Sequence, residues 1–289
     1  MSSSITKQSN WRRGLLGLLL VAVPVLLVCW MIVYPIILAF WDTLHADTPA
    51  GPAFSLDSYK FFFGDGFSLG NLWVTLWTTA VTTVLLLAIT LPMALYLRFS
   101  GGKLAAYIQA VALFPLFVPS ILLAYALIRT VGPNGTVDTL LHAVGLPKIK
   151  SPYLTPWGPI IGLIWDNLPL TLLILLSGLT SISTASVDAA RDVGAGPWAL
   201  LWSIILPRMA NSMLVAASFV VLGLFSAFTL PYLLGPAAPE MMGPFMQRTF
   251  NELSDPRQAT TQAVITFAFC AIFAYFYVRS VARSQRGRA

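Results

Sequence analysis

The chain has 289 residues, of which 57% are hydrophobic and only 10% charged, and its mean hydropathy is +0.78. A soluble domain carries about 25% charged residues, so 17 basic and 11 acidic residues are too few to cover a globule of this length in water. The composition argues against soluble enzymes, disordered scaffolds and nucleic-acid-binding proteins. It indicates a membrane protein. The basic residues behind its net charge of +6 are then expected to set its orientation in the membrane.

The apolar segments predict an all-α polytopic membrane protein, because a spanning helix needs about 20 apolar residues. Six segments meet this requirement: 15–40, 72–97, 104–128, 158–179, 213–234 and 259–278. The first follows two arginines like a signal peptide, but its apolar run exceeds the roughly 7–15 residues of a cleavable core. We therefore expect an uncleaved anchor helix. Prolines inside the spans predict kinks. In a membrane bundle, neighbouring helices and water can satisfy the backbone carbonyls that a proline leaves without a donor.

Lysine and arginine residues predict the orientation, because they are enriched in cytoplasmic loops. One side of the membrane would carry Lys7, Arg12, Arg13, Arg98, Lys103, Arg191, Arg208, Arg279, Arg283, Arg286 and Arg288. The other side would carry only Lys60, Arg129, Lys148, Lys150, Arg248 and Arg257. We expect both termini and the loop between the fourth and fifth spans to be cytoplasmic; an inverted chain is the alternative.

The remaining loops carry no signature of catalysis or cofactor binding. A turn at 132–135 followed by a helix over 136–144 is expected to lie at the membrane surface. His45 and His142 are too far apart to give a metal-ligand spacing. No phosphate-binding loop, nucleophile elbow or zinc-protease motif occurs. If the protein moves a solute with energy from ATP, another chain must hydrolyse the nucleotide.

One long loop, residues 181–207, has the pattern of a helix-turn-helix. Ser183 or Thr184 would cap a short helix, the turn at 194–197 would end it, and a second amphipathic helix would run to Pro207. Trp198, Leu201 and Trp202 supply apolar anchors. Such a unit suits docking of a helix into a partner's groove; an interfacial loop without a partner is the alternative.

This loop resembles the signature E-A-A-x-x-x-G-x(9)-I-x-L-P of permease subunits in binding-protein-dependent ABC importers. Asp188 stands in place of the glutamate, and the acid-for-acid change keeps the charge. The other matching positions, with one small residue beside the glycine, are Ala189, Ala190, Gly194, Ala195, Ile204, Leu206 and Pro207. Six spans with a long first extracytoplasmic loop extend the resemblance over nearly the whole chain.

The resemblance implies the type I importer permease fold and a set of partners. Residues 1–70 would form the anchor helix and first extracytoplasmic loop, 71–281 the transport core, and 282–289 a basic cytoplasmic tail. The partners implied are a cytoplasmic ATPase dimer docked on the 181–207 loop, a second and paralogous permease subunit, an extracytoplasmic solute-binding protein and membrane lipid. The chain itself would be a non-enzymatic, multi-pass protein of the bacterial inner membrane, without cofactor, metal or nucleic acid.

Several stretches are most similar to the spermidine/putrescine group of these permeases and favour a polyamine-like cargo: 131–135, 140–141, 156–169, 230–235 and 241–243. Relatives of that group carry ferric ion, thiamine, aminophosphonates or other small solutes, and a sugar permease is the near alternative. A secondary transporter is a further alternative, but it would be expected to show internal repeats, and none is evident.

The fourth span contains an acidic residue, Asp166, in an otherwise apolar segment. It lies about eight residues from the outer end, roughly 12 Å deep at about 1.5 Å per residue. A carboxylate at that depth should face the bundle interior. With Trp165 and Asn167 beside it, and Tyr232 in the fifth span, it could line a path for a small cation. The alternative is a structural hydrogen bond to another span or to a backbone amide freed near the kink.

Overall fold

The computed structural model describes residues 17, 19–48, 51–147 and 150–286, and nearly all of them are helical, as expected. The basic residues Lys7, Arg12, Arg13, Lys148 and Arg288 lie outside the described part. The last helix, α14 (Pro256–Arg286), continues through most of the predicted 282–289 tail. A short antiparallel hairpin of β1 (His45–Thr48) and β2 (Gly51–Phe54) is the only sheet within the described residues; turns and loops connect the helices.

Five described helices are long and apolar enough to cross a membrane: Leu19–Thr43, Gly66–Phe99, Trp157–Leu179, Pro197–Phe225 and Pro256–Arg279. The pair Gly102–Phe117 and Ser120–Ala143, whose two parts meet at 110°, is apolar enough to form a further, broken span or a re-entrant loop. Counting that pair as one span gives the six predicted crossings. The first helix has no buried residue in its apolar window, so it lies at the periphery of this chain.

The third predicted span is broken rather than continuous. It consists of α5 (Gly102–Leu113), the 3-10 turn η2 (Phe114–Phe117) and α6 (Ser120–Val131). Val118 is extended, and Pro119 stands at the N-cap of α6. A proline disfavours helical geometry in the residue before it, so the helix has to end before Pro119. Beyond the turn at 132–135, α7 (Thr136–Ala143) matches the predicted surface helix in extent.

The fifth span differs from the expected boundaries at both ends. The second helix of the 181–207 loop does not stop at Pro207; α10 (Pro197–Leu200), the π-turn η3 (Leu201–Ile205) and α11 (Leu206–Phe225) form one helix. The π-turn accommodates the ring of Pro207, which would otherwise collide with a carbonyl one turn earlier. A π-turn at Cys29–Val33 precedes Pro35 in the first helix in the same way.

At its other end this helix stops at Phe225, and a separate short helix, α12 (Thr229–Leu234), completes the crossing. Ser226 caps the break because its hydroxyl donates to the carbonyls of Leu222 and Gly223. The predicted span 213–234 is therefore two helices with a break at 226–228.

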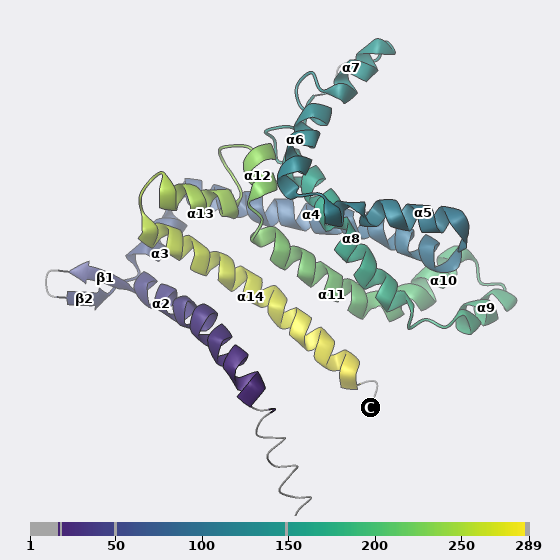
Figure 1. The fold of residues 1–289 in the computed structure, drawn as a ribbon, viewed down its shortest axis with the longest axis horizontal. Helices are drawn as coiled ribbons and strands as arrows, with labels where there is room; N and C mark the ends of the chain where they lie inside the picture. Colours follow the sequence, from purple (N-terminus) through teal and green to yellow (C-terminus); the bar gives the residue numbers. More distant parts are fainter. Residues whose placement is uncertain (1–16, 18, 49–50, 148–149, 287–289) are drawn as a thin grey trace, which may run out of the picture.

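The transmembrane helices form a bundle around α8 (Trp157–Leu179). The long helix α4 (Gly66–Phe99) packs on α8, α11 packs on α8 and α14, and α2 (Tyr34–Thr43) runs beside α14 (Figure 1). Gly178 permits the close approach of α8 to α11, since a Cβ there would collide with Ser212. The helices α6 and α7 project from the bundle, and α9 (Thr184–Asp192) lies at the far end of α8 (Figure 1).

Two short helices complete the side of the molecule opposite α9: α3 (Asp57–Gly64) and α13 (Met242–Asn251). Three apolar clusters stabilise the bundle. One joins the 181–207 loop to α8 and α11, the second joins α6, α8, α11 and α12, and the third joins α3, α4, α13 and α14.

Candidate functional site in the 181–207 loop and the α8 break region

The turn of the 181–207 loop depends on a glycine. Ser183 caps α9 as predicted, because its hydroxyl oxygen accepts from the Ser186 amide at 3.2 Å. At the other end the Ala195 amide donates to the Ala190 carbonyl and the Gly194 amide to the Arg191 carbonyl. This pair of bonds is a Schellman motif, in which one residue has to adopt a left-handed conformation. Gly194, with φ +83°, is that residue.

The motif positions divide into residues that hold the loop and residues that face outward. Ala190, Ala195 and Ile204 are half-buried and pack on the first apolar cluster. Leu206 is also half-buried, whereas the four remaining positions are exposed: Asp188, Ala189, Gly194 and Pro207. Val187, Leu200 and Ile205 are buried and fix the loop to α8 and α11. The loop is thus a rigid, packed unit.

The outward surface of this unit carries three large apolar side chains. Val193, Trp198 and Trp202 are 85%, 72% and 66% exposed, while Leu201 packs into the cluster instead. The ion pair beside it, Arg191 with Asp188 at 3.8 Å, is exposed and contributes little to stability. Val193 was not singled out from the sequence, although an aliphatic residue directly before the turn glycine was a usable signal. Three large exposed apolar side chains on a rigid support can insert into a partner's groove.

The three predicted path residues of α8 have distinct surroundings. Asp166 accepts a hydrogen bond at 3.2 Å from the hydroxyl of Ser120, the first residue of α6. The Trp165 ring meets Phe114 edge to face at 6.5 Å. The Asn167 amide donates to its own helix at the Leu163 carbonyl, at 2.9 Å. The sequence analysis gave a structural hydrogen bond to another span as the alternative role of Asp166. The bond from Ser120 is such an interaction.

Tyr232 lies on α12, which packs against both α6 and α8. Its ring stacks on Phe228 at 5.2 Å, and both rings are exposed, by 54% and 40%. Asn167 faces the α11 helix just before its break, because a Cβ on Gly223 would lie 3.7 Å from the Asn167 side-chain oxygen. The two helix breaks, at 118–119 and 226–228, therefore flank the same polar stretch of α8. Sequence reasoning identified neither Ser120 nor Phe228, although the prolines at 115 and 119 marked the first break.

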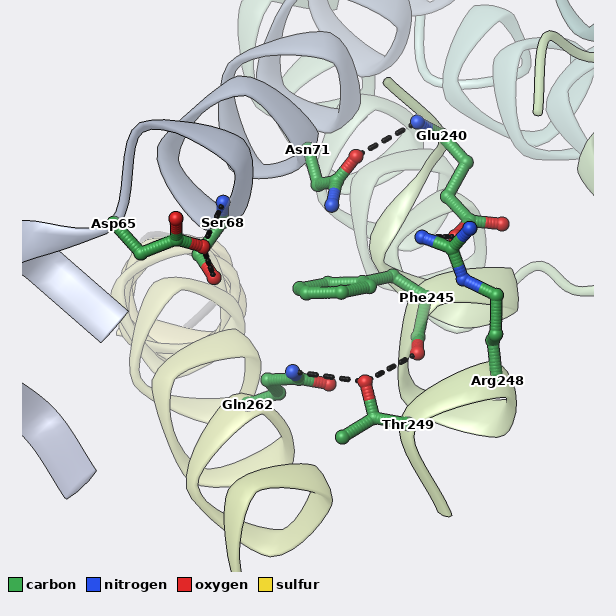
Figure 2. A network of polar contacts seen from close by, with 8 residues as sticks. All are labelled: Asp65, Ser68, Asn71, Glu240, Phe245, Arg248, Thr249 and Gln262. Carbon is green, nitrogen blue, oxygen red and sulfur yellow. Dashed lines mark hydrogen bonds and ion pairs between the residues drawn. The ribbon is translucent and has the colours of Figure 1, made fainter. Parts of the chain in front are cut away.

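A buried polar network joins α4, α13 and α14 on the side of the membrane opposite the 181–207 loop, and Gln262 of α14 enters it by donating to the Thr249 hydroxyl of α13 at 3.1 Å (Figure 2). Asn71 accepts from the Glu240 amide at 2.8 Å, and Thr75 accepts from the Met242 amide at 2.8 Å. The Arg248 guanidinium pairs with Glu240 at 2.6 Å and lies 5.2 Å from the Phe67 ring centroid. The sequence did not predict this network, because its members are up to 169 residues apart.

Two carboxyl groups on this side of the membrane have shifted pKa values of opposite sign. Burial raises the pKa of Glu240 above its usual range, and the neighbouring Arg248 only partly offsets that effect. Hydrogen bonds from the Ser68 hydroxyl and amide lower the pKa of Asp65, the N-cap of α4. Asp65 therefore stabilises the beginning of α4, whereas burial of the charged Glu240 side chain costs stability.

The described residues offer no set of three metal-ligating side chains. What they do present is a packed loop with three exposed apolar side chains at one end of the bundle and, between two helix breaks, a polar and aromatic stretch. Together with five apolar crossings, or six if the broken pair is one span, these features define a polytopic membrane protein with an internal polar region.

Comparison with known proteins places the chain in one family. The profile of the binding-protein-dependent transport system inner membrane component matches residues 86–287. The chain belongs to this family, the permeases of binding-protein-dependent ABC importers. It is therefore a multi-pass inner-membrane protein and not an enzyme, since ATP hydrolysis in these systems takes place on a separate subunit.

Relatives with different cargoes resemble the chain. The molybdenum transport system permease protein ModB of Azotobacter vinelandii is 24% identical over 71% of this chain and 92% of its own length. The trehalose/maltose permease MalF of Thermococcus litoralis is 23% identical over 99% of this chain and 100% of its own. The trehalose permease SugA of Mycobacterium tuberculosis is 30% identical over 76% and 72%.

A solved bacterial alginate ABC transporter in complex with a pentasaccharide-bound periplasmic protein contains a chain with the same fold. The TM-score is 0.76 at 17% identity, over 96% of both chains. The spermidine/putrescine permease PotB of Haemophilus influenzae is 25% identical, but over only 62% of this chain and 63% of its own. The similarity to the spermidine/putrescine group predicted from the sequence is thus one similarity among several and is not specific.

Proposed function

We propose that the chain is a permease subunit for a carbohydrate, and that it forms the path through which the solute crosses the inner membrane. The observation that carries this proposal is the extent of the similarity to sugar systems. The trehalose/maltose permease matches over 99% of this chain, and the alginate transporter chain over 96%. The polyamine permease matches over 62%. A carbohydrate therefore replaces the polyamine as the favoured cargo.

The chemistry of the α8 region supports a neutral, hydroxyl-rich cargo. A polyamine carries several ammonium groups, yet Asp166 is the only acidic residue in the crossing formed by α8, and the crossings of α4, α11 and α14 have none. The Asp166 carboxylate is also engaged by Ser120. The exposed Phe228 and Tyr232 rings offer flat apolar surfaces, on which the C–H face of a sugar ring can pack. We assign Trp165, Asp166, Asn167 and Tyr232 to this path.

In this proposal the 181–207 loop contacts a cytoplasmic ATPase dimer through Val193, Trp198 and Trp202, while the eight motif residues shape and support that surface. Both termini are cytoplasmic, and residues 71–281 form the transport core. A paralogous permease subunit completes the path, and an extracytoplasmic binding protein delivers the cargo. Closure of the ATPase dimer moves the loop and alters the packing of α8 against α11.

The test is a ligand screen on the cognate binding protein, followed by uptake into proteoliposomes that contain the complete transporter. Trehalose, maltose and an alginate oligosaccharide are compared with spermidine and molybdate. We expect a carbohydrate to bind and to be taken up only when ATP is present. Uptake of spermidine or molybdate with no carbohydrate binding would refute the assignment of cargo while leaving the permease role intact.

A further inference from the structure

A cavity of about 440 Å³ lies between the end of α2 and the beginning of α14. The two helices run side by side there (Figure 1). Its walls include Trp41, Asp42, His45 and Arg257. The cavity is on the side of the membrane opposite the 181–207 loop, directly beyond the apolar helix Leu19–Thr43. It is remote from the α8 region and takes no part in the proposed function.

Arg257 brings a cation into this cavity that the described residues do not neutralise. Its Nε and Nη2 atoms are shielded from solvent and have no hydrogen-bond acceptor among those residues. The Asp57 carboxylate is close enough to interact with it electrostatically, but that carboxylate already accepts from Ser55 and Lys60. A guanidinium always remains charged, and its planar set of donors matches the oxygens of a phosphate. The cavity therefore favours an anionic oxygen ligand.

Asp42 brings the opposite charge into the same cavity. Its side chain is exposed and forms no ion pair or hydrogen bond within the described part of the chain. Beside it the Trp41 ring stacks on His45 at 4.1 Å, and a hydrogen bond of 2.8 Å joins His45 Nδ1 and the Trp41 carbonyl. A tryptophan at the end of an apolar helix is typical of the membrane interface. A carboxylate and an aromatic face next to a guanidinium fit a zwitterion, with its ammonium on the acidic side.

Apolar surface continues from the cavity into the membrane. Ile36, Ile37 and Phe40 of α2 are 41%, 59% and 41% exposed, and Phe267 of α14 is 52% exposed. Free phosphate would leave this surface uncovered, whereas the acyl chains of a lipid would lie on it. A lipid with choline would lack N–H donors for Asp42, and one with glycerol would lack the cation.

We propose that this cavity binds the phosphoethanolamine headgroup of a membrane phospholipid. The phosphate lies against Arg257, the ammonium against Asp42 and Trp41, and the acyl chains along α2 and α14. The lipid thereby holds the peripheral first helix on the bundle. This helix buries little of its own surface against the rest of the chain.

The test measures lipid retention by the full-length chain with native mass spectrometry, after exposure to equal amounts of dioleoyl phosphatidylethanolamine and dioleoyl phosphatidylglycerol. We expect the wild type to retain the ethanolamine lipid preferentially. Arg257→Gln should lower its retention about tenfold, the loss of one or two charge-assisted hydrogen bonds. Asp42→Asn, a change of an exposed side chain, should lower ethanolamine retention and raise glycerol retention. Arg129→Gln, which removes an exposed positive charge at the end of α6, should have no effect.

Two results would overturn the proposal. One is equal retention of the ethanolamine lipid by the wild type, Arg257→Gln and Asp42→Asn. The other is displacement of the lipid by millimolar inorganic phosphate, because that would make the cavity a site for the free anion. Asp42→Asn keeps the test decisive if Arg257→Gln fails to fold.

Discussion

At the scale of single residues, the turn of the 181–207 loop needs a glycine because of its backbone conformation and not because of crowding by neighbouring atoms. Gly194 has φ +83° and no atom within 4 Å of where a Cβ would lie, so a side chain there is opposed by the backbone and not by crowding. Gly196, two residues later, has an ordinary φ of −70° and equally open surroundings. The two glycines form a matched pair for testing the turn.

We predict that Gly194→Ala costs about 1 kcal/mol in the turn and lowers cargo-stimulated ATP hydrolysis by the assembled transporter, because the cap would no longer hold Val193 and Trp198 in register. Gly196→Ala should leave this activity unchanged. Stimulated ATPase activity and uptake in proteoliposomes provide the measurement. Equal activity in both variants would contradict a role for the turn in docking.

Asp166 can act through its charge or through its hydrogen bond with Ser120. For a neutral carbohydrate we predict that Asp166→Asn retains most uptake, since the amide oxygen still accepts from Ser120. Asp166→Leu should lose uptake, because it leaves the Ser120 hydroxyl without its acceptor at the break, at a cost of about 1–3 kcal/mol. Uptake rates at matched expression distinguish the two. A selective loss of spermidine uptake in Asp166→Asn would instead indicate that the carboxylate is a counter-ion for a cationic cargo.

At the scale of elements, the polar network ties the short helix α13 to α4 and α14. Asn71 is fully buried and Glu240 is 8% exposed. Because Arg248 keeps 27% of its side chain exposed, its pairing with Glu240 is worth less than a fully buried pair. The positive charge of Arg248 nevertheless offsets part of the cost of burying the Glu240 carboxylate.

Arg248→Met should destabilise the protein by about 2 kcal/mol, since it leaves the Glu240 charge unpaired. The double variant Glu240→Gln/Arg248→Met should lose less than the sum of the two single changes. The pKa of Glu240, already raised by burial, should rise further in Arg248→Met. The charged form then costs stability above that pKa, so this variant should regain stability as the pH falls through it. Thermal unfolding in detergent at several pH values tests the cycle; additive single effects would contradict the coupling.

The π-turn Leu201–Ile205 is equivalent to one residue inserted into an α-helix. Deletion of Ser203 should therefore remove the extra residue and rotate everything before it by about 100° relative to α11, with a kink where the ring of Pro207 meets the carbonyl one turn earlier. We predict normal insertion, because the span remains intact, and loss of ATPase stimulation, because Trp198 would face a different direction. Deletion with full stimulation would show that the angular position of α10 is unimportant.

Much of the element plan was predictable from the sequence, and the exceptions have physical causes. Long apolar runs locate five crossings, and the serine cap and glycine stop locate α9. Proline has two outcomes that local sequence does not distinguish: Pro119 breaks its helix, whereas Pro207 is absorbed by a π-turn. The bond from Ser120 to Asp166 and the Glu240–Arg248 pair depend on packing between distant segments, so no local pattern indicates them.

At the scale of the whole molecule, the orientation in the membrane rests on charge asymmetry. A reporter enzyme that is active only outside the cytoplasm, fused after Ala289, should be inactive, and the same reporter inserted between Gly145 and Leu146, just after α7, should be active. Opposite activities would invert the orientation and place the 181–207 loop away from any cytoplasmic ATPase.

The continuous helix Pro197–Phe225 gives the molecule a direct mechanical connection. Its 29 residues span about 44 Å at 1.5 Å per residue, from the exposed Trp198 at one surface to the break at 226–228 beside α8. The π-turn and Pro207 lie close to its Trp198 end, and no break follows them before 226–228, so α11 can pass a displacement of that end along its length. In the proposed function, a displacement of the exposed tryptophans by the ATPase subunits would therefore change the packing where Asn167 and Gly223 meet.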